Sequence, residues 1–312
     1  MFVASRDQLK VVFLKKAFAA IVSVYMMVLL SAPVVKAQSF SAQDEKPIKV
    51  VASFYPIYIM VLNVAKDVPG LTVANLTPPM TGCLHDYTVT TNDMKKLAGA
   101  DIFVANGAGM EAFLDRIVLQ YPQVKIVQLA EGIPLVKGMG DEGDNPHVWV
   151  SISNAIVEVK NLGMNLEKID PVHAEIYRKN TADYAGKLEA LRLRMQAGLV
   201  PYKGQKIITF HEAFPYFAQE FGLEIAAVIA REPGSEPSAR ELADTVDIIR
   251  KEGIKALFSE PQYPSSAAQT IARETGATVY RLDPFVNGPD DPDAYFKIME
   301  KNLEVLRNAL SK

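Results

Sequence analysis

The chain has 312 residues, among them 33 Lys and Arg, 36 Asp and Glu, 4 His and one Cys, with a formal net charge of −3. This length allows two domains of ordinary size. The acidic balance argues against nucleic acid as a partner, because phosphate binding needs clustered Lys and Arg. A single cysteine excludes an intramolecular disulfide.

Residues 1–37 predict an export signal. Four basic residues, the last of them Lys16, precede the apolar run AFAAIVSVYMMVLL at 17–30, and a small-x-small cleavage pattern ends at Ala37. Cleavage there would remove five basic residues and one acid, leaving 28 basic and 35 acidic residues and a net charge of −7. The alternative is an uncleaved anchor, since the apolar stretch counted as 17–35 approaches the length of a membrane span.

We expect cleavage, because Ser31, Pro33 and Lys36 interrupt the longer apolar count. The mature protein would then be periplasmic or otherwise extracytoplasmic. No cysteine lies at the cleavage site, so we expect no lipid anchor.

Alternating strands and helices follow a short flexible leader at 38–47. The predicted strands of the first half are 48–54, 71–78, 101–107 and 124–130, and the predicted helices are 56–68, 90–100 and 110–120. Thr91 or Asn92 is the expected N-cap of the second helix. Such alternation predicts parallel βαβ units with right-handed crossovers. We assign residues 48–169 to an N-terminal α/β lobe.

Residues 170–199 predict one unusually long helix. Apolar residues recur at helical spacing at Ile176, Tyr184, Leu188, Leu191 and Met195. A helix of roughly 27 residues would be about 40 Å long, longer than an ordinary crossover. We interpret residues 170–200 as a rigid helix that connects two lobes.

The second half repeats the pattern of the first. Strands are predicted at 206–210, 224–230, 255–261 and 278–284, and helices at 215–222, 236–253 and 265–276, with a capping box at Ser238 and Glu241. ADIFVANG in the first half and IKALFSEP in the second are expected to be corresponding strands. The fold class is therefore α/β, with two Rossmann-like lobes of parallel sheet flanked by helices and joined by the long helix. The C-terminal lobe covers 201–312.

Four polar side chains follow or precede strand ends, where open α/β sheets bind ligands. They are His85, His147, His211 and Asp283. Each lobe supplies two of them. Three imidazoles and one carboxylate make a closed four-coordinate metal site. Taken singly, each histidine is more typical of a satisfied core or loop residue, and an Asp before Pro is an ordinary turn residue, so the prediction rests on the joint pattern.

Other residues near these positions have functional and purely structural interpretations. Cys83 lies two residues before His85, so on an extended loop both side chains point the same way, and a thiolate contact is a minor alternative. Glu260 is a candidate to orient an imidazole, with a plain surface or capping role equally open. His173 is expected on the surface, and Trp149 in packing.

Gly107-Ala-Gly109-Met-Glu-Ala112 follows a predicted strand and resembles a dinucleotide fingerprint. That fingerprint belongs after the first strand of its unit, and here the first strand is followed by SFYPIY. We expect the glycines to allow tight turns instead.

The chain resembles the metal-binding receptors of zinc and manganese ABC transporters, the cluster A-I or TroA-like family. The resemblance rests on VVASFYPIY, LHDYTVTTNDMKKLAGADIFVANGAGMEAFLD, NPHVWVS, TFHEAFPYFAQEFG, EPSARELADTVDIIRKEGIKALFSEPQ and ETGATVYRLDP, which together span nearly all of 48–286. It implies that His85, His147, His211 and Asp283 bind the ion. It also implies two lobes joined by a long helix.

Two departures bear on the choice of metal. Many zinc-specific members have a histidine-rich loop before the second ligand, whereas PLVKGMGDEGDNP here contains no histidine. Manganese-specific members commonly have a glutamate where this chain has His211. Three nitrogens and one oxygen favour Zn2+ over Mn2+, so we expect Zn2+, with Mn2+ or a mixed specificity as the alternative.

The expected function is capture of one divalent metal ion outside the cytoplasm and its delivery to an ABC-transporter membrane permease. We expect a monomer, no enzyme activity, no catalytic residues and no bound cofactor besides the transported ion. The alternative from a different class is an exported zinc hydrolase, with an open water position and Glu212 or Glu260 as base. A surface adhesin or metal-storage protein is a third interpretation.

Overall fold

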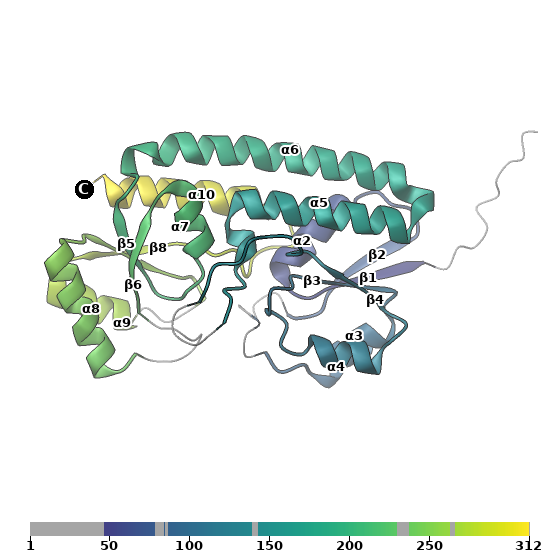
Figure 1. Cartoon of the computed structure of the whole chain (residues 1–312), viewed down its shortest axis with the longest axis horizontal. Coiled ribbons are helices and arrows are strands. Elements are labelled where there is room, and N and C mark those ends of the chain that lie inside the picture. The colour runs from purple at the N-terminus through teal and green to yellow at the C-terminus, as the bar shows by residue number, and fades with distance from the viewer. Residues whose placement is uncertain are drawn as a thin grey trace, which may run out of the picture. The chain divides into compact units, whose positions relative to one another are not determined.

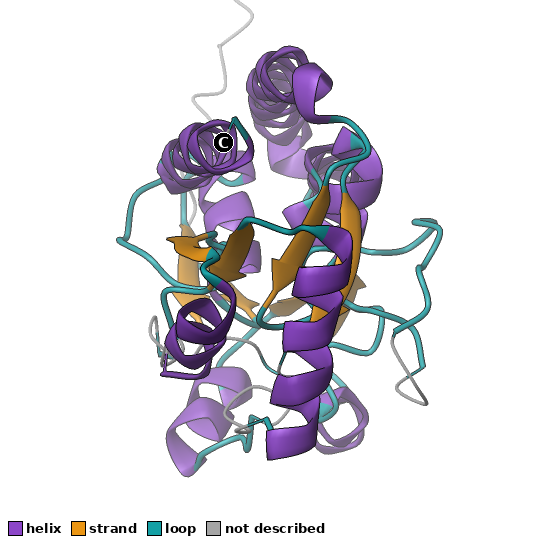
Figure 2. Ribbon diagram, turned by 90° about the vertical axis from the view of Figure 1, so that its left-hand side faces the viewer, coloured by secondary structure: helices purple, strands orange, loops and turns teal. Residues whose placement is uncertain are grey.

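The computed structural model describes residues 47–78, 84, 87–138, 143–229, 237–262 and 266–311. The predicted export signal and nearly all of the predicted leader lie outside them. From residue 46 onward the chain forms one compact unit. Within it, two four-stranded parallel sheets are each flanked by helices (Figures 1 and 2). The predicted fold class is confirmed.

The N-terminal sheet has the strand order β2-β1-β3-β4, with all neighbours parallel. Its strands are β1 (Ile48–Ala52), β2 (Leu71–Asn75), β3 (Ile102–Ala105) and β4 (Lys125–Gln128), and its helices are α2 (Tyr55–Val64), α3 (Thr91–Ala98) and α4 (Leu114–Gln120). All four residues of β3 are buried. A strand covered on both faces has a continuous apolar sequence, which is why IFVA could be recognised as a strand from the sequence.

The C-terminal sheet has the equivalent order β6-β5-β7-β8 and is also parallel. Its strands are β5 (Lys206–Thr209), β6 (Glu224–Val228), β7 (Ala256–Ser259) and β8 (Thr278–Arg281), and its helices are α7 (Pro215–Phe221), α8 (Ala239–Glu252) and α9 (Ser266–Thr275). The predicted correspondence of ADIFVANG and IKALFSEP is confirmed, because β3 and β7 occupy the same position in the two sheets.

Three longer helices cover one side of both sheets. They are α5 (Ile152–Ile169), α6 (Ala174–Leu199) and α10 (Ala294–Leu310). α6 has 26 residues and runs along both lobes (Figure 1), as predicted for a connecting helix. It starts later than predicted because residues 171–173 form a separate 3-10 turn, η2 (Pro171–His173). Two further 3-10 turns are η1 (Val148–Val150) and η3 (Val200–Tyr202).

α10 was not predicted from the sequence. Its buried side includes Tyr295, Met299, Asn302 and Leu306, and the helix packs against α6. The buried positions recur at helical spacing, so the signal was present. The helix closes the core over the second lobe, and its Asn302 side chain pairs with the backbone of Asp283.

The starts of α3 and α4 also differ from the sequence-based expectation. Thr90 caps α3 instead of Thr91 or Asn92, since Thr90 is extended and exchanges hydrogen bonds with Asp93 in a capping box. α4 starts at Leu114 instead of Met110, because the Glu111 carboxylate turns back to accept from the N–H groups of Asn106 and Gly107. The predicted capping box of Ser238 and Glu241 is confirmed at α8.

The chain turns sharply after β3. Gly107 has φ +80° and Gly109 has φ +85°, a region that glycine adopts without steric cost. The glycines serve this turn, as expected from the sequence.

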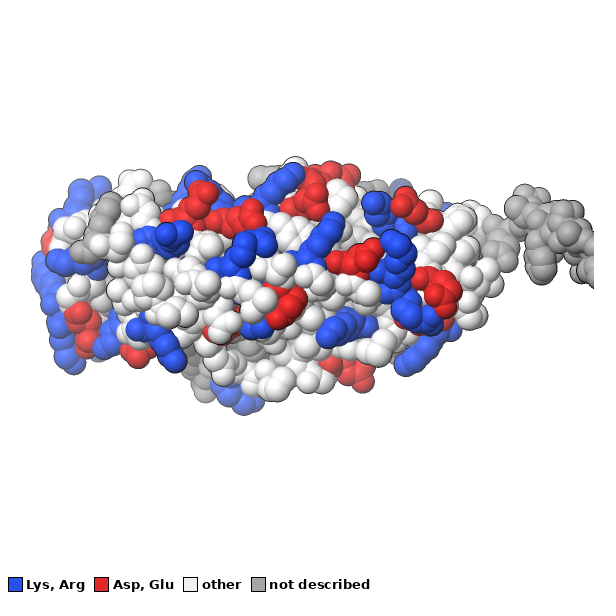
Figure 3. All heavy atoms as spheres, turned by 90° about the horizontal axis from the view of Figure 1, so that it is seen from above, with Lys and Arg blue, Asp and Glu red and all other residues white. Residues whose placement is uncertain are grey.

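The largest cluster of buried apolar side chains among the described residues extends through both lobes. It includes Phe103 of β3, Trp149 of η1, Leu191 of α6 and Phe258 of β7. Trp149 has no exposed surface, so its predicted packing role is confirmed. The outer face, with α6 across it, carries interspersed positive and negative side chains instead of a patch of one sign (Figure 3). Within the described part of the chain, no helix combines the length and apolar character needed to cross a membrane.

Candidate metal centre

His147 lies in the N-terminal lobe at the start of η1 and is 1% exposed. Its backbone N–H donates to Asn145 Oδ1 at 3.0 Å, and its ring Nδ1 lies 3.1 Å from the same oxygen. The ring also packs against Trp149, with the centroids 5.3 Å apart. The ring is therefore held on one side by an amide and on another by an indole.

His211 lies in the C-terminal lobe, two residues after the end of β5, and is 3% exposed. Its Nδ1 is 3.6 Å from Glu260 Oε2, and Glu260 follows directly after β7. Glu260 is 1% exposed and accepts a 2.6 Å hydrogen bond from Gln262 Nε2. Neighbouring parallel strands thus bring an imidazole and a carboxylate to one edge of the sheet.

The two histidine rings meet between the lobes. Their centroids are 4.7 Å apart with an interplanar angle of 82°. Both side chains are buried, so the pair is shielded from water. Two imidazole rings at this separation are within the range in which one metal ion with Zn–N bonds of about 2 Å can be bound by both.

Asp283 follows β8 and is held by its own backbone and by α10. Its Oδ1 accepts from Phe285 N at 2.8 Å, while its backbone N–H and C=O pair with the Asn302 amide at 2.9 and 2.8 Å. Burial raises the pKa of Asp283 to about 6, opposed by the hydrogen bond from Phe285 and reinforced by repulsion from Glu260. A nearby cation would favour the charged form of this carboxylate.

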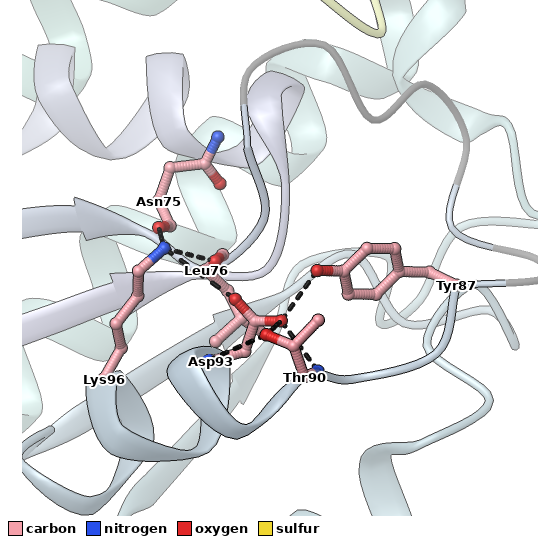
Figure 4. Close-up of polar contacts among 6 residues, drawn as sticks. All are labelled: Asn75, Leu76, Tyr87, Thr90, Asp93 and Lys96. Atoms are coloured by element: carbon pink, nitrogen blue, oxygen red, sulfur yellow. Dashed lines mark hydrogen bonds and ion pairs between the residues drawn. The ribbon is translucent and has the colours of Figure 1, made fainter.

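His85, the fourth predicted ligand, lies outside the described residues, as does Cys83. The chain on either side of this segment is attached to α3 (Figure 4). Asp93 accepts hydrogen bonds from Tyr87 Oη and Thr90 Oγ1, both at 2.7 Å. Lys96 Nζ donates to the carbonyls of Asn75 and Leu76 at 2.9 and 2.5 Å.

The described residues therefore bring together His147, His211 and Glu260, with Asp283 close enough to Glu260 to feel its charge. Within the described ranges, no three His, Cys, Asp or Glu side chains are arranged so that together they could hold a metal ion, and His85 is not among the described residues. The four-ligand set remains a prediction. His173 lies elsewhere, partly buried instead of on the surface, with Nδ1 2.8 Å from Asp170.

Sequence reasoning missed Asn145. It is 3% exposed and contacts His147 on one side and the Glu212 backbone on the other. Only its spacing, two residues before His147 in NPH, offered a signal.

Comparison with known proteins identifies the family. The family described as "zinc-uptake complex component A, periplasmic" matches residues 50–309. The chain belongs to this zinc-uptake family. The resemblance predicted from the sequence is confirmed, and the family is defined by an uptake component, not by an enzyme.

Individual relatives of the zinc-uptake family agree. The zinc-binding protein AdcA of Streptococcus pyogenes is 32% identical over 295 residues, covering 84% of this chain and 56% of that protein. The AdcA of Streptococcus pneumoniae, 29% identical over 286 residues with 85% of this chain and 56% of that protein covered, is named a lipoprotein. The high-affinity zinc uptake system protein ZnuA of Bacillus subtilis is 30% identical over 280 residues, covering 84% of this chain and 87% of that protein. The chain thus spans little more than half the length of the AdcA proteins.

A solved structure with the same fold is the solute-binding protein FpvC of Pseudomonas aeruginosa in complex with Mn2+. It has a TM-score of 0.77 and 31% sequence identity, and covers 85% of this chain and 99% of that one. The relatives are thus named for zinc, and this structural neighbour contains manganese.

Proposed function

We propose that the protein is an extracytoplasmic receptor that binds one divalent metal ion between its lobes and delivers it to an ABC-transporter permease. One observation carries the proposal: His147 and His211, from opposite lobes, meet as a buried pair with ring centroids 4.7 Å apart. Membership of the zinc-uptake family supports it. His85 and Asp283 are the proposed third and fourth ligands.

Zinc is the proposed ion. Three imidazoles and a carboxylate suit Zn2+ better than Mn2+, by ligand softness and by the Irving–Williams order. The relatives named for zinc support this choice, while FpvC with its Mn2+ keeps manganese as the alternative within the same mechanism.

The proposed mechanism is binding without turnover. The imidazoles must be deprotonated and Asp283 charged, so affinity is expected to fall as the pH drops through the histidine range. If Asp283 completes the shell, no position remains for the nucleophilic water of a hydrolase. Release would follow when docking to the permease separates the ligands of the two lobes.

We propose further that the protein acts as a monomer, and that residues 1–37 direct export and are then removed without acylation. Mass spectrometry of the mature protein from cells should find Gln38 at the N-terminus and no lipid. A lipid-modified or uncleaved chain would contradict this part, and the S. pneumoniae relative is named a lipoprotein.

The decisive experiment is metal titration of chelator-stripped protein. Wild type should bind one equivalent of Zn2+, more tightly than Mn2+ in a competition assay. His147→Ala and His211→Ala should each weaken Zn2+ binding by ~100-fold or more, beyond the 10- to 100-fold typical of residues that only support ligands. His173→Ala is the matched control, since His173 pairs with Asp170 away from the site.

Two or more equivalents bound tightly, or unchanged binding in both histidine variants, would refute the site.

A further inference from the structure

The two segments that carry His147 and His211 are joined directly across the lobes. Asn145 Nδ2 donates to the backbone carbonyl of Glu212 at 2.8 Å, and Tyr216 Oη donates to the backbone carbonyl of Asn145 at 2.6 Å. Asn145 and Tyr216 are each 3% exposed. Neither hydrogen bond uses a histidine ring atom. The link between the segments is therefore independent of metal coordination.

The contact with Glu212 determines which way the Asn145 amide faces. A backbone carbonyl only accepts, so the NH2 group must point to Glu212 and Oδ1 must point to His147. The His147 backbone N–H, which only donates, also contacts this oxygen at 3.0 Å and confirms the orientation. Both sides of the amide are thus assigned by groups with a single hydrogen-bonding role.

The orientation of the amide in turn selects a tautomer of His147. Nδ1 lies 3.1 Å from Asn145 Oδ1, which can only accept a hydrogen bond. The ring therefore carries its proton on Nδ1. In a neutral imidazole this leaves the lone pair on Nε2, which becomes the nitrogen available to a metal.

We propose that Asn145 is a positioning residue of the metal site. It holds the Nδ1–H tautomer of His147, and through the same side chain it attaches His147 to the segment that carries His211. Its effect on metal affinity rests on the proposed function; its effect on the tautomer does not. Ligands that are oriented before the ion arrives need less ordering when it binds.

Glu220 supports the same segment by a different route. From α7 it accepts hydrogen bonds from Ser151 Oγ at 2.7 Å, Ser153 Oγ at 2.6 Å and Ser153 N at 3.1 Å, at the start of α5. These bonds hold the chain after His147 without contacting its ring. Glu220→Gln therefore weakens the support of the backbone after His147 and leaves the contact between Asn145 and the His147 ring in place.

The first test needs no metal. Protein labelled with 15N-histidine and stripped of metal would be examined at pH 8.5 by two-bond 1H–15N correlation, with His147→Gln to assign the signals. Wild type should show His147 with the proton on Nδ1. Asn145→Ala should lose this preference, whereas Asn145→Asp, which keeps an acceptor oxygen, and Glu220→Gln should retain it.

An unchanged His147 tautomer in Asn145→Ala would overturn the proposal. If that variant fails to fold, Asn145→Leu fills the same space without an acceptor and should lose the tautomer in the same way; a retained tautomer there would also overturn it.

The second test measures Zn2+ affinity by chelator competition. Asn145→Ala should weaken binding by ~10- to 100-fold, and Asn145→Asp by less. Asn165→Ala is the matched control, because the Asn165 amide donates within α5 to Asn161 O. A lost tautomer with undiminished Zn2+ affinity would overturn the role of Asn145 in the site. Failure of wild type to bind zinc would count against the proposed function alone, since the tautomer is measured without metal.

Discussion

Asp93 and Glu158 are both buried carboxylates, yet their surroundings shift their pKa values in opposite directions. Burial would raise the pKa of Asp93, but hydrogen bonds from Tyr87 and Thr90 hold it below its usual value. Burial raises the pKa of Glu158 well above its usual range, and repulsion from Glu111 adds to this. Neither oxygen of Glu158 has a hydrogen-bond partner among the described residues. A buried carboxyl without donors favours its neutral form.

Because their pKa values shift in opposite directions, the contributions of these two residues to stability change with pH in opposite directions. The unfolded chain releases the Glu158 proton above about pH 4.3, whereas the folded chain keeps it. The contribution of Glu158 to stability is therefore complete at acid pH and is lost as the pH rises toward its folded pKa. Asp93, with a lowered pKa, contributes above about pH 4 and loses this contribution as the pH falls.

Glu158→Gln should stabilise the metal-stripped protein, because glutamine is neutral at every pH and keeps the shape of the protonated carboxyl. The gain in melting temperature should grow between pH 5 and pH 8, measured by circular dichroism. Asp93→Asn should do the reverse, destabilising the protein at pH 7 and converging on wild type near pH 3. Glu274→Gln, at an exposed position of α9, is the control and should show neither trend. A gain that is flat with pH would show that Glu158 is already charged in the fold.

At the scale of elements, the contact between α5 and α6 depends on one glycine. Gly163 is buried in α5, and a Cβ there would lie against Thr181 of α6, overlapping Oγ1 and 2.9 Å from Cγ2. The Cβ of Thr181 would itself lie 3.0 Å from the added Cβ, so turning Thr181 about χ1 does not remove the contact. Gly186, also in α6, has nothing within 4 Å of the corresponding Cβ position and is exposed. The two glycines therefore differ in tertiary surroundings while sharing the same low helix propensity.

Gly163→Ala should destabilise the protein by ~1–2 kcal/mol, because overpacking exceeds the gain in helix propensity. Gly186→Ala is the matched comparison and should stabilise by ~0.5–1 kcal/mol. Both are measured by urea denaturation. Adding Thr181→Ala to Gly163→Ala should recover part of the loss, and a double variant that unfolds as early as the single one would argue against the clash.

The largest hydrophobic cluster of the described residues spans both lobes. The buried cluster runs from β1 through η1 and α6 to α10, and hydrogen bonds such as Trp149 Nε1 to Pro284 O at 2.8 Å cross between the lobes. The C-terminal lobe has a second cluster between its sheet and helices α8 and α9, with Ile208, Leu257 and Ile271 among its members. Both sheets nevertheless also pack into the shared cluster. This continuity favours a single cooperative transition.

Unfolding of the metal-stripped protein should be one transition by every probe. Fluorescence of Trp149, the only tryptophan, and far-UV circular dichroism should give the same midpoint. Zinc at 100 times its Kd should add ~2.7 kcal/mol, which raises the midpoint by about 5–10 °C at ~2–4 °C per kcal/mol. Two separate midpoints would contradict the shared core and would favour lobes that unfold independently.

The sequence predicted all eight strands of the described residues, and the fully buried strands were recognisable from continuous apolar runs such as IFVA and ALFS. Helix ends were less accurate where a neighbouring side chain decided them, as at Thr90 and Glu111. The long connecting helix was recognisable from its uninterrupted apolar spacing. The candidate ligands were found by residue type at strand ends. Glu260 was noticed without a definite role, and Asn145 was missed, because an asparagine has no spacing rule that marks it as a partner of histidine.

The sequence by itself determined the α/β class, the repetition of the two lobes and the residue types able to bind a metal, because periodicity and strand-end chemistry are local properties. Only the tertiary structure decided that His147 meets His211, that the Asn145 amide faces His147 through its oxygen, and that Glu158 is enclosed without donors. Each of these depends on contacts between residues 50 or more positions apart or on burial by several elements, and a linear pattern contains no information on such distances.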